Sequence, residues 1–314
     1  MGSDSRVRRL STGEIAVEPR PPHPLEEHVS VVVTGATGQL GRLIVESLVA
    51  RGVPAAEITA TGRSIDKIAD LAAAGVTVVA SDYDDPASLD AAFAGTDVLV
   101  LVSASEIGKR LPQHQNALDA ALRAGVGRIV YTSIPKADST PMILAQEHQA
   151  TEAAIIASGL PYTFVRNAWY VENYTPQFPT YLEHGIVGAA GDGKVSLATR
   201  ADYAEAAAVV ASTDGHVNAV YELGGDSITL TELAALVGDA AGQPVAYTDV
   251  DEATLAGILV NAAGFPEPVA AVFADVDSRI KAGDLHVTSG DLERLIGRTP
   301  TPVADSVKAA IAAL

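Results

Sequence analysis

The stretch SVVVTGATGQLGRLIVESL, residues 30–48, places the strongest constraint on how this chain folds. Three valines run directly into Gly35, Gly38 and Gly41, and apolar residues at helical spacing follow. On a strand-to-helix turn, glycines at these positions permit a tight bend, let the backbone approach a pyrophosphate and let strand and helix pack closely. The N–H groups at the start of the helix then point at the phosphates. Because the spacing is G-x-x-G-x-x-G and not the commoner G-x-G-x-x-G, a tight turn without a ligand is the alternative.

Strand-like and helix-like segments alternate from residue 29 to residue 165. The strands are continuous apolar runs, which indicates a parallel sheet covered by helices on both faces. The expected strands are VSVVVTG, ITATG, VTVVASD, DVLVLVSAS, GRIVYTS and PYTFVRN. We therefore predict the α/β class, with a Rossmann-type, doubly wound parallel sheet over residues 29–165. Residues 166–314 mix short strands and helices, and we expect them to form a smaller, mixed α/β substrate-side lobe packed on the sheet.

The first 28 residues show neither an apolar core typical of signal peptides nor any helical or strand periodicity. We interpret residues 1–28 as a disordered leader and leave them out of the fold.

Composition excludes several kinds of function. The chain has no cysteine, so disulfides, thiolate catalysis and cysteine-bound metals are ruled out. Its seven histidines lack metal-site spacing, so no metal is expected. The formal net charge of −18 repels nucleic-acid phosphates and anionic lipids. No apolar run approaches the ~18 residues of a membrane-spanning helix. We expect a cytoplasmic monomer or homodimer that binds neither nucleic acid nor membranes.

The end of the second expected strand indicates which dinucleotide the glycine turn would bind. Binders of a ribose 2′-hydroxyl normally carry Asp or Glu there. Here the strand ends TATGRS, with Arg63 at that position and Lys67 four residues later. An arginine suits a 2′-phosphate, so NADP(H) is preferred and NAD(H) remains possible. The alternative is that Arg63 is a solvated loop residue.

Polar side chains follow successive strands at their carboxyl ends, which is where ligands of such sheets bind. Asp82 is suited to accept a hydrogen bond from the adenine amino group, and Ser103 to Ser105 are expected beside the ribose and the nicotinamide. The cofactor residues expected from these positions are Gly35, Ala36, Thr37, Gly38, Gln39, Leu40, Arg63, Lys67, Asp82, Tyr83, Ser103, Ala104, Ser105 and Ser133.

Several blocks together resemble one known group. They are TGATGQLG, GRSIDK, SDYDDPASL, YTSIPKADSTP, EHQATE, RNAWYVENY and AAGDGKVSLATRADYAEAAA. The chain resembles the NmrA-like atypical short-chain dehydrogenases, most closely the type 2 NAD(P)H:quinone oxidoreductases, with triphenylmethane reductase a nearby relative. The resemblance runs from about residue 30 to the C-terminus and implies an NAD(P)H-dependent oxidoreductase.

The resemblance also exposes a missing pair. The broad superfamily uses Tyr-x-x-x-Lys, followed by a glutamate in many extended members. Aligned on Glu152, the lysine position holds His148 and the tyrosine position holds Leu144. Without the usual proton donor, reduction of simple ketones is disfavoured. A quinone suits this site, because it accepts hydride readily and the hydroquinone anion takes its proton from water.

Site residues on the substrate side also follow from the resemblance. It implies that residues 166–170 line the nicotinamide and the substrate, with Arg166 among the cofactor residues. Asn167 is expected to hold the carboxamide or a substrate oxygen, and His148 to orient the ribose or supply a proton, so these two are the catalytic candidates. Flat faces for an aromatic acceptor are expected from the substrate candidates Trp169, Tyr170, Tyr131 and Tyr174.

Two other functions remain open from the sequence. The chain could be an NADP(H)-binding redox sensor that regulates a partner protein without turnover, because some NmrA-like members lack the same pair. It could also reduce triarylmethane-type dyes, a reading that differs from quinone reduction only in the shape of the pocket.

Overall fold

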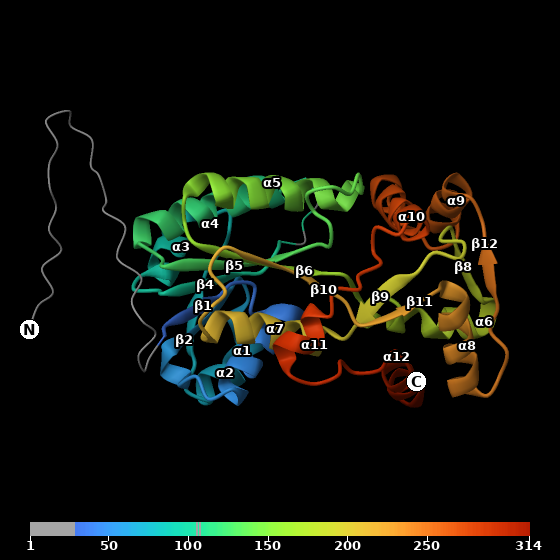
Figure 1. Cartoon of the computed structure of the whole chain (residues 1–314), viewed down its shortest axis with the longest axis horizontal. Coiled ribbons are helices and arrows are strands. Elements are labelled where there is room, and N and C mark those ends of the chain that lie inside the picture. The colour runs from blue at the N-terminus through green and yellow to red at the C-terminus, as the bar shows by residue number, and fades with distance from the viewer. Residues whose placement is uncertain (1–28, 105, 107) are drawn as a thin grey trace, which may run out of the picture.

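A parallel sheet of seven strands forms the middle layer of the molecule (Figure 1). The computed structural model describes residues 29–104, 106 and 108–314, so the predicted leader 1–28 and Ser105 lie outside the described residues. The strand order is β10-β6-β5-β4-β1-β2-β3, and every pairing is parallel. The strands are β1 (Val31–Val33), β2 (Ile58–Gly62), β3 (Thr77–Ala80), β4 (Val98–Leu101), β5 (Arg128–Ser133), β6 (Tyr162–Asn167) and β10 (Ala219–Leu223). The predicted Rossmann-type fold is confirmed, and its first six strands lie where the apolar runs placed them.

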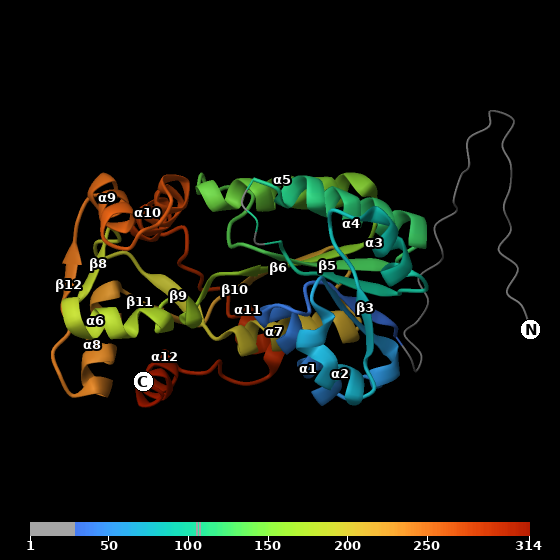
Figure 2. The same ribbon diagram turned by 180° about the vertical axis from the view of Figure 1, so that it is seen from behind.

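Helices cover both faces of this sheet, as the figures show from opposite sides (Figures 1 and 2). On one face lie α3 (Pro86–Phe93), α4 (Arg110–Ala124) and α5 (Ile143–Ser158), and on the other lie α1 (Gln39–Ala50), α2 (Ala69–Ala73), α7 (Arg200–Ser212) and α11 (Asp291–Ile296). The middle strand β1 is completely buried between these layers. Since β1 pairs with β2 on one side and β4 on the other, the strand order reverses there, and this reversal opens a crevice at the carboxyl ends.

The remaining elements build a lobe at one end of the sheet (Figure 2). Its strands are β7 (Trp169–Tyr170), β9 (Val195–Ala198) and β11 (Asp226–Ile228) in one small sheet, with β8 (Ile186–Gly188) and β12 (Tyr247–Asp249) in another. Its helices are α6 (Phe178–His184), α8 (Leu230–Ala241), α9 (Glu252–Asn261), α10 (Glu267–Lys281) and α12 (Val303–Ala312). Thr229 and Glu232 form a capping box at the start of α8.

The sheet draws on both halves of the chain. The sequence placed all of residues 166–314 in the smaller lobe, but β10 pairs with β6 and α7 packs against α1. Residues 200–223 therefore belong physically to the sheet layers, because their apolar side chains complete the core beneath the sheet. We propose a division into a sheet domain, which includes residues 200–223, and a smaller lobe.

Within the described residues, no helix is long and apolar enough to cross a membrane.

Candidate active site

The glycine turn after β1 holds the backbone in a shape that suits glycine. Gly35 has a φ of 62°, in the left-handed region. A Cβ atom on Gly41 would collide with the carbonyl oxygen of Gly35, and one on Gly62 would lie 2.6 Å from Thr37 Oγ1. The start of α1 therefore packs tightly against β1, and the end of β2 approaches the same turn.

The first turn of α1 has backbone N–H groups that no side chain caps. Gly38 is the N-cap residue, and the first turn contains no acidic side chain. The first N–H groups of a helix have no partner within the helix and give this end a partial positive charge. The turn is therefore suited to receive the phosphates of a dinucleotide.

A cavity of about 460 Å³ opens over this turn; we call it the turn cavity. Ten of the predicted cofactor residues line it: Gly35, Thr37, Gly38, Gln39, Leu40, Arg63, Asp82, Tyr83, Ser103 and Ala104. Gly41, named from the sequence for its packing in the turn, also lines it, as do residues that the sequence reasoning missed: Thr34, Gly62, Ser81, Val102, Glu106, Gln113 and Arg200.

Arg63 lies directly after the last residue of β2 and remains largely exposed, with 62% of its side chain accessible. Its Nη1 atom is 3.0 Å from Glu106 Oε1, within the lining of the turn cavity. A hydrogen bond from Lys109, followed by the charge of that lysine and of Arg63, lowers the pKa of Glu106. Arg63 is thus a cation that a phosphate can engage in place of this half-buried carboxylate.

Arg200, at the start of α7, is a lining residue that sequence reasoning missed. Its guanidinium lies 5.1 Å from the centre of the Tyr170 ring, and its Nη2 donates to Asn173 Oδ1 at 3.3 Å. The Glu172 carboxylate accepts from the Arg200 backbone N–H at 3.0 Å. Arg200 thus brings a second cation to the turn cavity, and the predicted substrate residue Tyr170 supports it.

Four of the described residues predicted to bind the cofactor do not line the turn cavity, namely Ala36, Lys67, Ser133 and Arg166. Ala36 is buried and its N–H donates to the Thr61 carbonyl at 2.8 Å. The Lys67 carbonyl accepts from Arg42 Nη1 at 3.3 Å, on the outer side of α1. Ser133 is buried at the end of β5. Ala36 and Lys67 therefore take no part in the cavity wall, whereas Ser133 ends a strand that neighbours β4, and the residues directly after β4 line the cavity.

Two buried polar atoms at neighbouring strand ends have no hydrogen-bond partner among the described residues. They are Ser133 Oγ on β5 and Asn167 Oδ1 on β6. An unpaired buried polar group costs about 1–3 kcal/mol. Asn167 is oriented by the bond from its Nδ2 to the Tyr170 hydroxyl at 3.2 Å. These strand ends therefore fit a ligand that supplies hydrogen-bonding groups, such as the ribose and carboxamide of a nicotinamide nucleotide.

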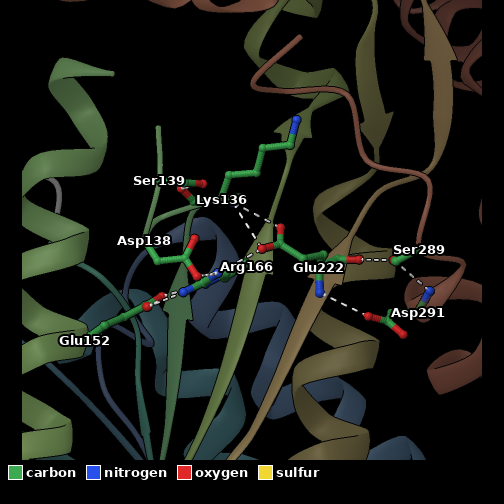
Figure 3. Close-up of polar contacts among 8 residues, drawn as sticks. All are labelled: Lys136, Asp138, Ser139, Glu152, Arg166, Glu222, Ser289 and Asp291. Atoms are coloured by element: carbon green, nitrogen blue, oxygen red, sulfur yellow. Dashed lines mark hydrogen bonds and ion pairs between the residues drawn. The ribbon is translucent and has the colours of Figure 1, made fainter. Parts of the chain in front are cut away.

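Arg166 lies elsewhere than predicted. Its Nε and Nη2 atoms donate to the two oxygens of Glu152 at 3.0 and 2.7 Å, and Nη1 donates to Glu222 at 3.0 Å (Figure 3). Asp138 lies 3.3 Å from the same Nη1. Burial would lower the pKa of Arg166, but the bonds to Glu152 and Glu222 outweigh it and raise that pKa. Carboxylates thus surround this guanidinium, and it does not line the turn cavity.

His148 occupies a buried position next to Tyr131. Its Nδ1 lies 2.8 Å from the Tyr131 hydroxyl, and burial, with Arg110 and His114 nearby, holds the pKa of His148 well below its ordinary value. The imidazole is therefore neutral. Tyr131 is completely buried and lines neither cavity, so its predicted contact with substrate is not supported by its position. Leu144 packs against the core of the lobe.

A second cavity, of about 800 Å³, opens in the lobe; we call it the lobe cavity. Trp169 and Tyr174, both predicted substrate residues, line it. The other aromatic lining residues are Tyr181, Phe265 and Phe273, and the large aliphatic ones are Ile186, Val187, Leu230, Leu255, Ile258, Leu259 and Val276. The one carboxylate among its described lining residues is Asp277.

The two cavities are neighbours. Arg200 lines the turn cavity, and it donates to Asn173, which lines the lobe cavity. Asn167 at the end of β6 is followed two residues later by Trp169 in the wall of the lobe cavity. A nicotinamide at the strand ends would therefore lie beside an aromatic-lined space. Over the described part of the chain, no group of three or more His, Asp or Glu side chains is placed to hold a metal.

Comparison with known sequences finds matches that cover most of the chain. The model of the NmrA-like family matches residues 27–295. The chain is 48% identical over 279 residues to quinone oxidoreductase 2 of Escherichia coli, an alignment that covers 88% of this chain and 97% of that protein.

Solved structures give the same result. NADPH-dependent quinone oxidoreductase of Escherichia coli, complexed with NADPH, matches with a TM-score of 0.86 at 47% identity, over 89% of this chain and 99% of that one. Triphenylmethane reductase of Citrobacter, complexed with NADP(H), matches with a TM-score of 0.84 at 39% identity, over 90% of this chain and 100% of that one.

Proposed function

This chain belongs to the NmrA-like family, and on that premise we propose that it is an NADPH-dependent oxidoreductase that transfers hydride to quinones or similar electrophilic aromatic acceptors. The observation that carries the proposal is the adjacency of the two cavities, a turn cavity at the strand ends that contains Arg63 and Arg200, and an aromatic lobe cavity beside it. The similarity to quinone oxidoreductase 2 supports the same acceptor class.

The turn cavity supplies a binding group for each part of NADPH. The uncapped N–H groups at the start of α1 receive the pyrophosphate, with Arg200 as a nearby cation. Arg63 binds the 2′-phosphate, because the end of β2 carries this arginine in place of the acidic residue that would accept from a 2′-hydroxyl. Ser133 and Asn167 provide their unpaired oxygens to the nicotinamide end. NADP(H) is therefore the preferred cofactor.

Catalysis in this site depends on positioning. Bound NADPH supplies the hydride, and the residues of the chain hold the two rings in register and exclude water. Trp169 and Tyr174 offer flat faces to the acceptor, and Asn167 directs its amide toward the carboxamide or the acceptor oxygen. The proton that completes a hydroquinone comes from water, because Leu144 stands where the superfamily places its tyrosine.

His148 is a positioning residue in this proposal. A neutral imidazole whose Nδ1 faces the Tyr131 hydroxyl keeps one tautomer when that hydroxyl donates. Its low pKa makes the imidazolium rare at neutral pH, so His148 is a poor source of the proton.

The cytoplasmic location and the monomeric or homodimeric state remain predictions from the sequence.

NADPH oxidation tests the function directly. Absorbance of NADPH is followed with and without benzoquinone or menadione, and the same assay is run with NADH. Acceptor-dependent oxidation that is faster with NADPH supports the proposal. Tight NADPH binding without turnover of any quinone or dye would favour the sensor. Turnover of a triarylmethane dye alone would favour the dye reductase. The similarity of this chain to the Citrobacter triphenylmethane reductase makes that dye class the one to test.

A further inference from the structure

We infer that Asp277 makes the lobe cavity selective for aromatic molecules that carry a protonated amine or another N–H donor. This inference deepens the proposed function, on which it rests for the view that the lobe cavity is the substrate side. It narrows the acceptor class to amine-bearing or cationic aromatics, such as amino-substituted quinones and quinone imines.

The Asp277 carboxylate is held by a backbone N–H group. Asp277 lies on α10 and is partly buried in the cavity wall. Its Oδ2 accepts from the Ala189 backbone N–H at 2.8 Å. Among the residues that the structure describes, no lysine, arginine or histidine forms an ion pair with it. The carboxylate therefore lines the cavity with its charge uncompensated by the protein.

The charge around Asp277 is negative. The Asp249 carboxylate on β12 adds to it and raises the pKa of Asp277 further. Desolvation is the larger cause, and together they bring this pKa to about 6. Asp277 is thus mostly ionised at neutral pH although its surroundings disfavour the charge. A ligand cation in the cavity would offset that cost.

Aromatic side chains form part of the wall of the lobe cavity. Aromatic faces attract cations through their quadrupoles, and they also stack on flat rings. Five aromatic side chains line the cavity, namely Trp169, Tyr174, Tyr181, Phe265 and Phe273. A cavity with these walls and one carboxylate combines the two features that recognise an aromatic ammonium.

A purely structural role does not account for the charge. The bond from the Ala189 N–H could equally be accepted by the amide oxygen of an asparagine. An asparagine would keep this bond without placing an anion beside an apolar cavity. The negative charge of Asp277 is therefore best explained by a ligand that brings a positive charge or an N–H donor to it.

The fluorescence of Trp169 measures binding in this cavity directly. Trp169 is the only tryptophan of the chain and lines the lobe cavity. The probes share one aromatic body and differ in charge: biphenyl-4-ylmethylammonium, biphenyl-4-ylmethanol and biphenyl-4-carboxylate. Each is titrated into the full chain, with excitation at the red edge of the indole band, where biphenyl absorbs little. The same titrations are made with Asp277→Asn and with Asp239→Asn, which removes an exposed acid from α8 of the same lobe.

We expect the ammonium to bind the unmodified chain about tenfold more tightly than the alcohol, since a charge-assisted hydrogen bond exceeds a neutral one by about that factor. The carboxylate should bind most weakly. In Asp277→Asn the ammonium and the alcohol should bind alike, whereas Asp239→Asn should keep the original order. Equal binding of ammonium and alcohol in the unmodified chain would overturn the inference without any variant, and so would a failure of all three probes to quench Trp169.

Menadione reduction by NADPH separates this inference from the proposed function. Turnover of menadione together with loss of the ammonium preference would leave the function standing and remove the role of Asp277. If the three probes bind in the expected order of affinity but no acceptor is reduced, the role of Asp277 is supported and the proposed reductase function is contradicted.

Discussion

Arg63 and Glu106 form an ion pair inside the lining of the turn cavity, with Arg63 Nη1 3.0 Å from Glu106 Oε1. Because Arg63 is mostly exposed, this pair contributes little to stability. A bound 2′-phosphate carries more charge than one carboxylate and can displace it from the guanidinium. The pair therefore concerns cofactor choice more than folding.

Reversing the charge at position 63 should weaken NADPH binding selectively. In Arg63→Glu we expect the Kd for NADPH to rise about 10- to 100-fold, the value of one charge-assisted contact, and the Kd for NADH to change less than about threefold. Isothermal titration with both nucleotides measures this. Arg51→Glu, at the exposed end of α1, is the matched control. Equal losses for both nucleotides would show that Arg63 does not contact the 2′-phosphate.

Adding one methyl group at Gly41 should destabilise the protein. A Cβ there would collide with Gly35, so Gly41→Ala should lower the free energy of unfolding by about 1–3 kcal/mol, as overpacking usually does. Gly257→Ala is the control, since a Cβ in that helix meets nothing and should add up to about 1 kcal/mol. Urea unfolding of the three proteins decides. An unchanged midpoint for Gly41→Ala would contradict the tight turn.

The paired carboxylate of Arg166 should be important for stability. Glu152→Gln removes a buried partner from Arg166, and we expect a loss of about 3 kcal/mol in the free energy of unfolding. Glu46→Gln removes a partly exposed partner of Arg42 and should cost less than about 0.5 kcal/mol. Thermal and urea unfolding compare the two. Similar small losses would mean that Glu222 and Asp138 suffice to hold the guanidinium.

Asp277 should make stability depend on pH in a definite direction. Its pKa is raised from 3.8 to about 6, so the folded chain holds this proton more tightly than the unfolded chain does. The stabilising contribution is complete below about pH 4 and is lost as the pH rises through about 6. Asp277→Asn should therefore unfold about 2 kcal/mol less readily than the unmodified chain near pH 8, and about equally near pH 4.

Urea unfolding at the two pH values checks this, and a variant that is less stable near pH 8 would contradict it. The other groups facing Asp277 do not produce the same change. Tyr174, Tyr181 and Tyr247 have raised pKa values and stay neutral over the range. Asp249 has a lowered pKa and stays ionised.

His148 should not supply a titrating group to the reaction. Burial keeps the pKa of the His148 imidazole well below its ordinary value. The imidazole is therefore neutral at neutral pH and above. We expect His148→Gln to lower kcat by less than about tenfold and to leave the shape of the pH–rate profile between about pH 6 and 8 unchanged. Disappearance of one limb of the profile in the variant would instead identify His148 as the proton donor.

Local patterns in the sequence predicted the turn and most of the sheet, and pairings between distant residues could not be predicted. The valines before Gly35 and the basic residue after β2 are read within a short segment, so ten of the residues that line the turn cavity could be named from the sequence. Arg200 joins that cavity only because α7 returns beneath the sheet. Arg166 was assigned to the cofactor because the carboxylates that surround it come from three other segments.

The return of α7 and β10 to the sheet also governs how the chain can be assembled. Ile44 on α1 shares one core with Tyr203 and Ala207 on α7, so the inner face of α1 has no complete cover until residues 200–212 are present. During synthesis, β6 likewise stays an open edge until β10 leaves the ribosome. We expect the nucleotide-binding half to mature only after more than two thirds of the chain has been translated, and a fragment ending at residue 165 to aggregate instead of folding.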